Sequence, residues 1–164
     1  MRPRTRQELT TALRRRGVED EIVEEILDRY DEVGMIDDAA FARAWVSSRH
    51  HGKGLARRAL AGELRRKGVG SEEVGAALEE LDSDTEEATA RALVERRLRT
   101  ESSKAPDAAF RRLTGMLARK GYPAGLAIRV VKEALAERAE SAEFAGELDV
   151  DALADAVADN DADE

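Results

Sequence analysis

The sequence predicts an all-α protein, an elongated array of three tandem three-helix repeats whose first repeat is truncated. Three observations support this prediction. One glycine context recurs three times, around Gly17, Gly68 and Gly121, at spacings of 51 and 53 residues. Apolar residues after each glycine keep the i, i+3, i+4, i+7 spacing of a helix that buries one face. No stretch shows the strict alternation that predicts a half-buried strand.

Each copy has the same order of parts around its glycine. Two leucines precede it by four and eight positions, two basic residues precede it directly, and an apolar stripe follows. This order predicts a helix, a glycine that ends it in the left-handed conformation, and a second helix. The leucines are Leu9, Leu13, Leu60, Leu64, Leu113 and Leu117. The stripes are Val23, Ile26, Leu27 and Tyr30, then Val74, Ala77, Leu78 and Leu81, then Ala127, Val130, Val131 and Ala134.

A further helix is expected before this pair in two copies, because the run from Phe41 to Val46 parallels the run from Thr89 to Val94. The first copy lacks it and begins at a capping box, Thr5 with Glu8. The expected boundaries are a partial repeat at 1–37, repeats at 38–83 and 84–138, and an acidic tail at 139–164. Stacked units of this kind present an extended face rather than a pocket.

Two residues are expected to start the later helices of their repeats. Ser71 is predicted to be an N-cap, because its hydroxyl can accept from a free amide. Pro123 is predicted in a first helical turn, where a missing N–H costs nothing.

Charge is divided unevenly along the chain. The net charge is -8, but the segment from 138 to 164 holds ten acidic residues against Arg138 alone. The remaining body is nearly neutral and rich in arginine. This asymmetry points to nucleic acid or a nucleoprotein as the partner.

Composition restricts the compartment and the chemistry. The chain has no cysteine, which excludes disulfides and cysteine zinc sites and suits a reducing compartment. No apolar run is long enough for secretion or for a spanning helix, so we expect a cytoplasmic protein with no membrane contact. No nucleophile with a paired base, metal cluster or phosphate loop is recognised, so we expect no enzymatic activity and no cofactor.

Several motifs in the middle copy occur in a fixed order. They are Gly34-Met-Ile-Asp-Asp38, Phe41-Ala-Arg-Ala-Trp-Val46, Gly52-Lys-Gly54, Arg57-Arg58 and Glu63-Leu-Arg-Arg-Lys-Gly-Val69. Together they resemble the RecX family of bacterial recombination regulators, and the likeness extends more loosely over residues 5–137. Met35, Leu55 and Gly62 depart from the usual pattern.

The resemblance implies three tandem three-helix repeats. It also implies binding along the groove of the RecA recombinase filament, with inhibition of filament growth, strand exchange, ATP hydrolysis and co-protease activity. The expected partners are the RecA filament and, as a further candidate, single- or double-stranded DNA. A monomer is expected.

Basic residues are the candidates for contact with filament or DNA. The three dibasic pairs recur in register, so stacked repeats would display them as a stripe. The alternative is that cations in a last helical turn only stabilise the helix dipole, by about 0.3–1 kcal/mol. Both interpretations stay open. The candidates are Arg15, Arg16, Arg43, Arg49, Lys53, Arg57, Arg58, Arg65, Arg66, Lys67, Arg119 and Lys120.

Other motifs favour structural roles. The Gly52-Lys-Gly54 run lacks the spacing of a nucleotide loop and is interpreted as a turn between helices. Trp45 shares a helix face with Phe41, which favours core packing over base stacking. Asp37 and Asp38 precede a helix and are expected to cap it.

Two further motifs suggest metals and are interpreted otherwise. His50 and His51 are adjacent and would point apart on a helix, so they are not expected to share a metal. The run from Asp159 to Asp163 imitates the start of a calcium loop, but the chain continues by one residue only.

The acidic tail supports two expectations. Dense like charge predicts a disordered segment. Helical spacing of Val150, Leu153, Ala154 and Val157 instead suggests a weak helix that folds back on the basic stripe. For the whole chain, the leading hypothesis is a regulator of RecA filaments. A helical-repeat protein that binds DNA phosphates directly is the alternative, and a generic protein scaffold is third.

Overall fold

The structure, a computed structural model, describes the backbone of residues 2–101 and 105–160 and the side chains up to residue 145. This part of the chain forms eight helices and no strand, which confirms the all-α class. The helices are α1 (Arg6–Arg15), α2 (Asp20–Glu32), α3 (Asp38–Lys53), α4 (Arg57–Arg66), α5 (Ser71–Glu79), α6 (Ser83–Thr100), α7 (Pro106–Arg119) and α8 (Ala124–Asn160).

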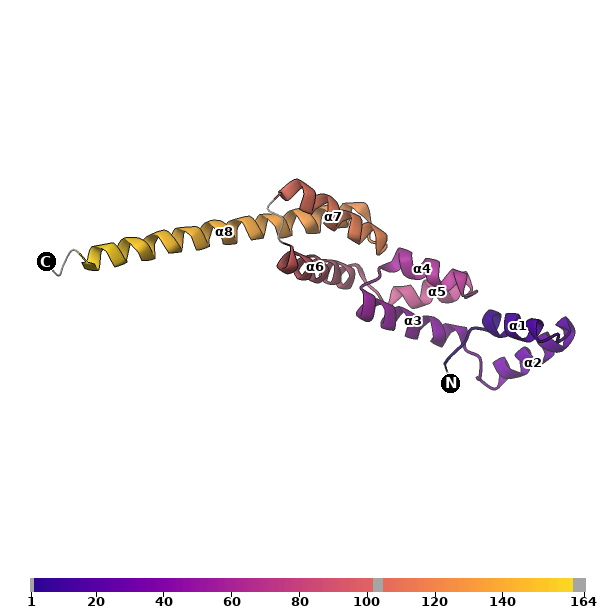
Figure 1. The fold of residues 1–164 in the computed structure, drawn as a ribbon. Helices are drawn as coiled ribbons and strands as arrows, with labels where there is room; N and C mark the ends of the chain where they lie inside the picture. The colour runs from indigo at the N-terminus through magenta and orange to yellow at the C-terminus, as the bar shows by residue number, and fades with distance from the viewer. Residues whose placement is uncertain (1, 102–104, 161–164) are drawn as a thin grey trace.

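The helices form three groups that follow one another along an elongated body (Figure 1). The first group holds α1 and α2, the second α3 to α5, and the third α6 to α8. Each group has its own apolar core, centred on Leu27, Leu64 and Leu117 in turn. The prediction of three repeats, the first lacking a helix, is therefore confirmed.

The three recurrent glycines end the helices as the sequence predicts. Gly17, Gly68 and Gly121 have φ angles of 80°, 80° and 93°, in the left-handed region where a Cβ is disfavoured. Each follows one of the helices α1, α4 and α7. These three equivalent helices are called the middle helices below, after their place in a full repeat.

Helix starts agree with the sequence in two places and differ in two. The Thr5 hydroxyl accepts from the Glu8 amide in a complete capping box, and Asp37 accepts from the Ala40 amide. The N-cap of α5 is Gly70, with no side-chain bond, so the prediction for Ser71 is wrong by one position. Pro123 precedes α8 and its carbonyl accepts from Ala127, so it caps the helix from outside the first turn.

The truncated first repeat leaves apolar side chains uncovered. Leu60 and Leu64 are fully buried beneath α3, whereas the equivalent Leu9 and Leu13 are half-buried. Tyr30 is 41% exposed, while Leu81 at the same position of the second repeat is 4% exposed. A missing helix thus thins the first core without removing it.

The last helix is much longer than its repeat requires. Its apolar contacts with the third core end near Leu135, yet α8 continues to Asn160 and leads away from the repeats (Figure 1). Alanine and glutamate favour this continuation of the helix. Along this course the helix does not fold back over the repeats (Figure 1). Asp161 to Asp163, in the calcium-like run, lie outside the described residues.

Among the helices of the described residues, none is both long and apolar enough to cross a bilayer.

Candidate binding surface along the repeats

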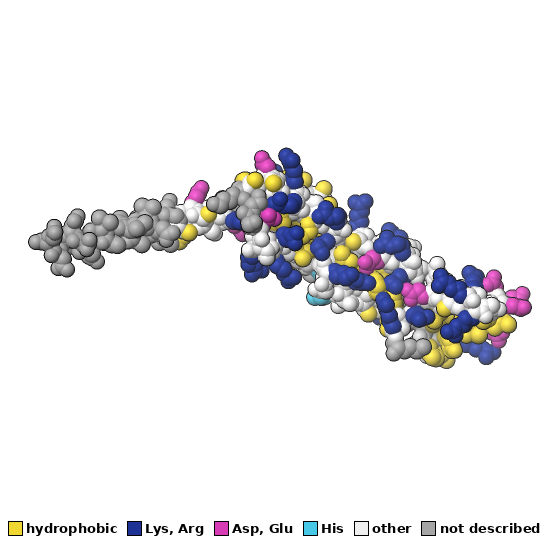
Figure 2. Space-filling view, viewed as in Figure 1, with side chains coloured by type: hydrophobic (Ala, Val, Ile, Leu, Met, Phe, Trp, Pro, Cys, Tyr) yellow, Lys and Arg dark blue, Asp and Glu magenta, His cyan; other side chains and the backbone are white. Residues whose placement is uncertain are grey.

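Charge is sorted by helix within the repeats. The middle helix α4 carries four arginines and one glutamate, and α7 carries three arginines and one aspartate. In contrast, α2 carries seven acidic residues against Arg29. Figure 2 shows the resulting line of basic side chains along the body, over the middle helices.

The first member of each dibasic pair is free for a partner. Arg15, Arg66 and Arg119 are exposed, and no hydrogen bond or ion pair engages their side chains within the described part of the chain. Arg66 and Arg119 also lie the same way. A Cβ built on Gly62 would be 3.4 Å from an Arg66 guanidinium nitrogen, and one built on Gly115 would be 3.2 Å from that of Arg119. We call Arg15, Arg66 and Arg119 the basic ridge.

The second members have other surroundings, and two of them join repeats. The Lys67 ammonium lies 2.7 Å from the Glu8 carboxylate. The backbone carbonyl of Lys67 accepts from the Thr5 hydroxyl at 2.7 Å. The Lys120 ammonium donates to the Lys53 carbonyl at 2.7 Å. Arg16 is the exposed C-cap of α1.

The joint between the second and third repeats is rich in buried polar contacts. The Ala56 amide donates to the Lys120 carbonyl at 2.8 Å, and the Tyr122 hydroxyl donates to the Gly54 carbonyl at 2.8 Å. Glu86, 5% exposed, accepts from the Arg57 amide. Burial, and secondarily the charge of Glu86, raises the pKa of Tyr122, so its hydroxyl stays protonated and remains a donor.

His50 belongs to the same joint. Its Nδ1 lies 2.8 Å from the Leu55 carbonyl and its Nε2 lies 2.7 Å from the Thr89 hydroxyl. The carbonyl can only accept, so Nδ1 carries the proton. His51 is exposed and bonds to the Ser47 carbonyl instead. His50 therefore packs between helices, whereas His51 faces solvent.

The remaining candidates divide into engaged and free side chains. Arg49 stacks over Trp45 at 4.3 Å and lies 3.8 Å from Glu63. Arg57 donates to the Leu78 carbonyl at 3.2 Å. The side chains of four others are exposed and without an ion pair in the part that the structure describes: Arg43, Lys53, Arg58 and Arg65.

The aromatic pair lies at the edge of the second core. Phe41 and Trp45 stack with ring centroids 5.7 Å apart, and both are half-buried. The Trp45 indole N–H donates to Glu63 at 2.8 Å. One side of the Phe41–Trp45 pair packs against the second core, as expected, and the other side borders an open cleft.

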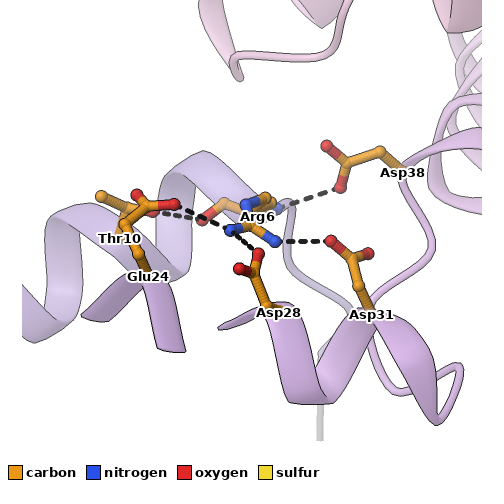
Figure 3. Close-up of polar contacts among 6 residues, drawn as sticks. All are labelled: Arg6, Thr10, Glu24, Asp28, Asp31 and Asp38. Atoms are coloured by element: carbon orange, nitrogen blue, oxygen red, sulfur yellow. Dashed lines mark hydrogen bonds and ion pairs between the residues drawn. The ribbon is translucent and has the colours of Figure 1, made fainter. Parts of the chain in front are cut away.

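An arginine that sequence reasoning missed fixes the first repeat (Figure 3). The Arg6 guanidinium lies 3.0 Å from Glu24, 2.7 Å from Asp28 and 2.5 Å from Asp31. The hydrogen bonds that it donates to these carboxylates, the one to Asp28 foremost, raise its pKa. Its amide donates to Asp38 at the start of α3. The spacing of the three acids, i, i+4 and i+7, places them on one face of α2 and could have signalled a basic partner.

The fold and the arrangement of its charges define a tandem helical-repeat protein with an extended basic surface. Family models match each repeat: the first three-helix domain of RecX at residues 1–29, the second at 37–78 and the third at 84–131. The chain belongs to the RecX family.

Curated relatives agree with this assignment. The chain is 55% identical over 145 residues to the regulatory protein RecX of Streptomyces coelicolor, covering 88% of this chain and 77% of the relative. It is 56% identical over 142 residues to that of Thermobifida fusca, covering 87% and 77%. Against the relative from Mycolicibacterium smegmatis, identity is 46% over 144 residues. These relatives are named as regulatory proteins, not as enzymes.

Solved structures share the fold. The crystal structure of RecX from Lactobacillus salivarius aligns with a TM-score of 0.74 at 18% identity, covering 81% of this chain and 86% of the other. A second crystal structure, of a regulatory protein RecX, aligns with a TM-score of 0.69 at 22% identity, covering 80% of this chain and 64% of the other.

Proposed function

We propose that this protein binds the RecA recombinase filament along its groove through the basic ridge. Binding there inhibits filament growth and with it strand exchange, ATP hydrolysis and co-protease activity. The observation that carries the proposal is the recurrence of Arg15, Arg66 and Arg119. They stand at one position of successive repeats and are exposed without an ion pair among the described residues. Membership in a family of regulatory proteins supports it.

The ridge suits a polymeric nucleoprotein for a physical reason. A free exposed guanidinium can make bidentate bonds to carboxylate or phosphate without first breaking an internal ion pair. Three of them on an elongated body can contact successive parts of a long partner. In this proposal the protein acts as a cytoplasmic monomer, and its effect needs no cofactor.

The test measures ATP hydrolysis by RecA on single-stranded DNA while this protein is added below equimolar amounts. We expect inhibition by the natural chain and a loss of inhibition of at least tenfold in potency for the variant Arg15→Gln, Arg66→Gln, Arg119→Gln. The matched control is Arg97→Gln, Arg99→Gln, Lys132→Gln, which removes the same charge from exposed positions on other helices. Inhibition absent from the natural chain would refute the function. Equal inhibition by both variants would refute the ridge as its site.

Direct binding to DNA phosphates is the second candidate, favoured by the same free guanidiniums. Affinity for naked single-stranded DNA would then fall steeply with salt, by about 0.7 logarithmic units per contacted phosphate for each tenfold rise in salt. Loss of the three ridge arginines would reduce that slope by about 2. Tight, salt-sensitive binding to naked DNA with no inhibition of ATP hydrolysis would favour this candidate over the first.

A further inference from the structure

Two clefts lie at equivalent places in the chain, one at each joint between repeats. The first is bordered by the segment Arg2-Pro3-Arg4 and by one face of α3. The second is bordered by Lys53-Gly54-Leu55, at the same distance before its middle helix, and by the matching face of α6. A cleft is therefore a product of how one repeat meets the next, not an accident of one surface.

Several lining residues of the two helices also correspond. Phe41, Ala44 and Trp45 in the first cleft occupy the positions of Thr89, Ala92 and Leu93 in the second. The two aromatic rings give the first cleft, of about 460 Å³, a largely apolar wall. Met35, 72% exposed, extends this wall.

Positive charge outweighs negative charge around the first cleft, whose lining holds Arg2, Arg4 and Asp37. Arg2 and Arg4 line it and also line a neighbouring hollow, which holds Arg15, Arg66 and Lys67. Within the described residues, no ion pair engages the side chains of Arg2 and Arg4, and both are exposed. The apolar cleft is therefore continuous with two members of the basic ridge.

We infer that the first cleft is a docking site for a protein segment that presents one large apolar side chain flanked by carboxylates. The apolar side chain enters between Met35 and the Phe41–Trp45 pair, and the carboxylates meet Arg2 and Arg4. This inference rests on the proposed function, since the segment belongs to the recombinase filament. It adds to the ridge a contact that depends on shape and burial of apolar area rather than on charge alone.

A nucleic acid base fits the cleft less well. Arg49 and Lys67 already lie 4.3 Å and 4.5 Å from the Trp45 ring, and Phe41 stacks beside it, so a base would have to displace them. The apolar side chain of a protein segment can instead pack against Met35 and the edges of the two rings without displacing these cations.

Neighbouring serines on α3 give a matched pair of reporters. Ser48 lines the cleft and Ser47 does not, while both are exposed. Because the chain has no cysteine, Ser48→Cys and Ser47→Cys each accept a single bimane label. Each labelled protein is mixed with RecA filament on single-stranded DNA or with that DNA alone, and anisotropy records binding in parallel. We expect the filament to shift the bimane emission at position 48 to the blue and to leave position 47 unchanged.

The other outcomes overturn the inference in distinguishable ways. Filament binding with no shift at 48, or with equal shifts at 47 and 48, refutes the docking site and leaves the proposed function standing. A shift at 48 with DNA alone identifies a nucleic acid occupant. Absence of filament binding refutes both the function and the docking site.

A second pair of variants tests the cleft without a label. Ala44 and Ala92 are both exposed and occupy equivalent positions, so arginine at either site leaves the cores intact, which circular dichroism checks. Ala44→Arg fills the aromatic cleft and should weaken filament binding at least tenfold at both low and high salt. Ala92→Arg should change it less than twofold. Equal affinities of the two variants would contradict the docking site.

Discussion

Replacing Gly121 by alanine should both destabilise the protein and open the joint between its second and third repeats. An alanine Cβ at this position would lie 2.5 Å from the Ala59 amide nitrogen and 2.8 Å from the Ala59 Cβ. Both are too close, and the first belongs to backbone that cannot rotate away. Gly17 provides the control, since its φ of 80° is similar and a Cβ there would meet nothing within 4 Å.

The two substitutions share one cost and differ in another. A left-handed conformation costs an alanine about 1–2 kcal/mol, of which about 0.4–1 kcal/mol is recovered because the unfolded chain is stiffer. Gly17→Ala should therefore lower the free energy of unfolding by about 1 kcal/mol. Gly121→Ala must also separate Ala56 from Lys120 and Tyr122 from Gly54. Two lost hydrogen bonds at about 1 kcal/mol each bring its total to about 3 kcal/mol.

Urea unfolding followed by far-ultraviolet circular dichroism measures both free energies, and small-angle X-ray scattering measures the radius of gyration. Gly121→Ala should change the scattering curve, because the angle between two repeats is altered, whereas Gly17→Ala should not. Equal destabilisation by the two variants would show that the joint is looser than its contacts imply, and would refute the reasoning.

Three further substitutions test the joints and helices. Burial raises the pKa of Glu8, but hydrogen bonds from Lys67 and the Thr5 amide outweigh it and hold the pKa below its ordinary value. This stabilisation is present above about pH 4.3, the pKa of a glutamate in the unfolded chain, and is lost as the pH falls through the lower pKa of the folded chain. Glu8→Gln should therefore flatten the fall in the urea midpoint between pH 5 and pH 3. Gly75→Ala should raise the free energy of unfolding by about 0.5–1 kcal/mol, because Gly75 is helical and exposed and a Cβ there would meet nothing within 4 Å. A lower free energy of unfolding would contradict the assignment of α5. Arg6→Leu should cost about 1 kcal/mol in low salt and less in high salt, since its carboxylate partners are about half exposed; a cost unaffected by salt would point to packing instead.

The repeats were predictable because their signals are local. The distance from Leu9 to Gly17 is two helical turns, and the same distance in the other copies leaves little freedom to misalign them. Capping by Thr5 and Asp37 also depends on residues three positions apart. Patterns of this length survive in the sequence because helix formation itself depends on them.

The joints were not predictable, since their contacts span long stretches of chain. Thr5 reaches the Lys67 carbonyl across 62 residues and Tyr122 reaches Gly54 across 68. Lys67 and Lys120 look like their basic neighbours in the sequence, and the structure alone separates the members that tie repeats from those that remain free. The first cleft was missed for the same reason, since Arg2 and Met35 meet Trp45 through the packing of two repeats.

The length of α8 affects how the size of this protein should be measured. At 1.5 Å per residue its 37 residues span about 55 Å, and roughly 40 Å of that extends past Leu135, where contact with the third core ends. An extended rod has more friction than a compact segment of the same mass. Gel filtration calibrated with spherical standards will therefore overestimate the mass of the 18.0 kDa chain and imitate a dimer. Light scattering, which responds to mass rather than to drag, is the appropriate measure of its assembly state.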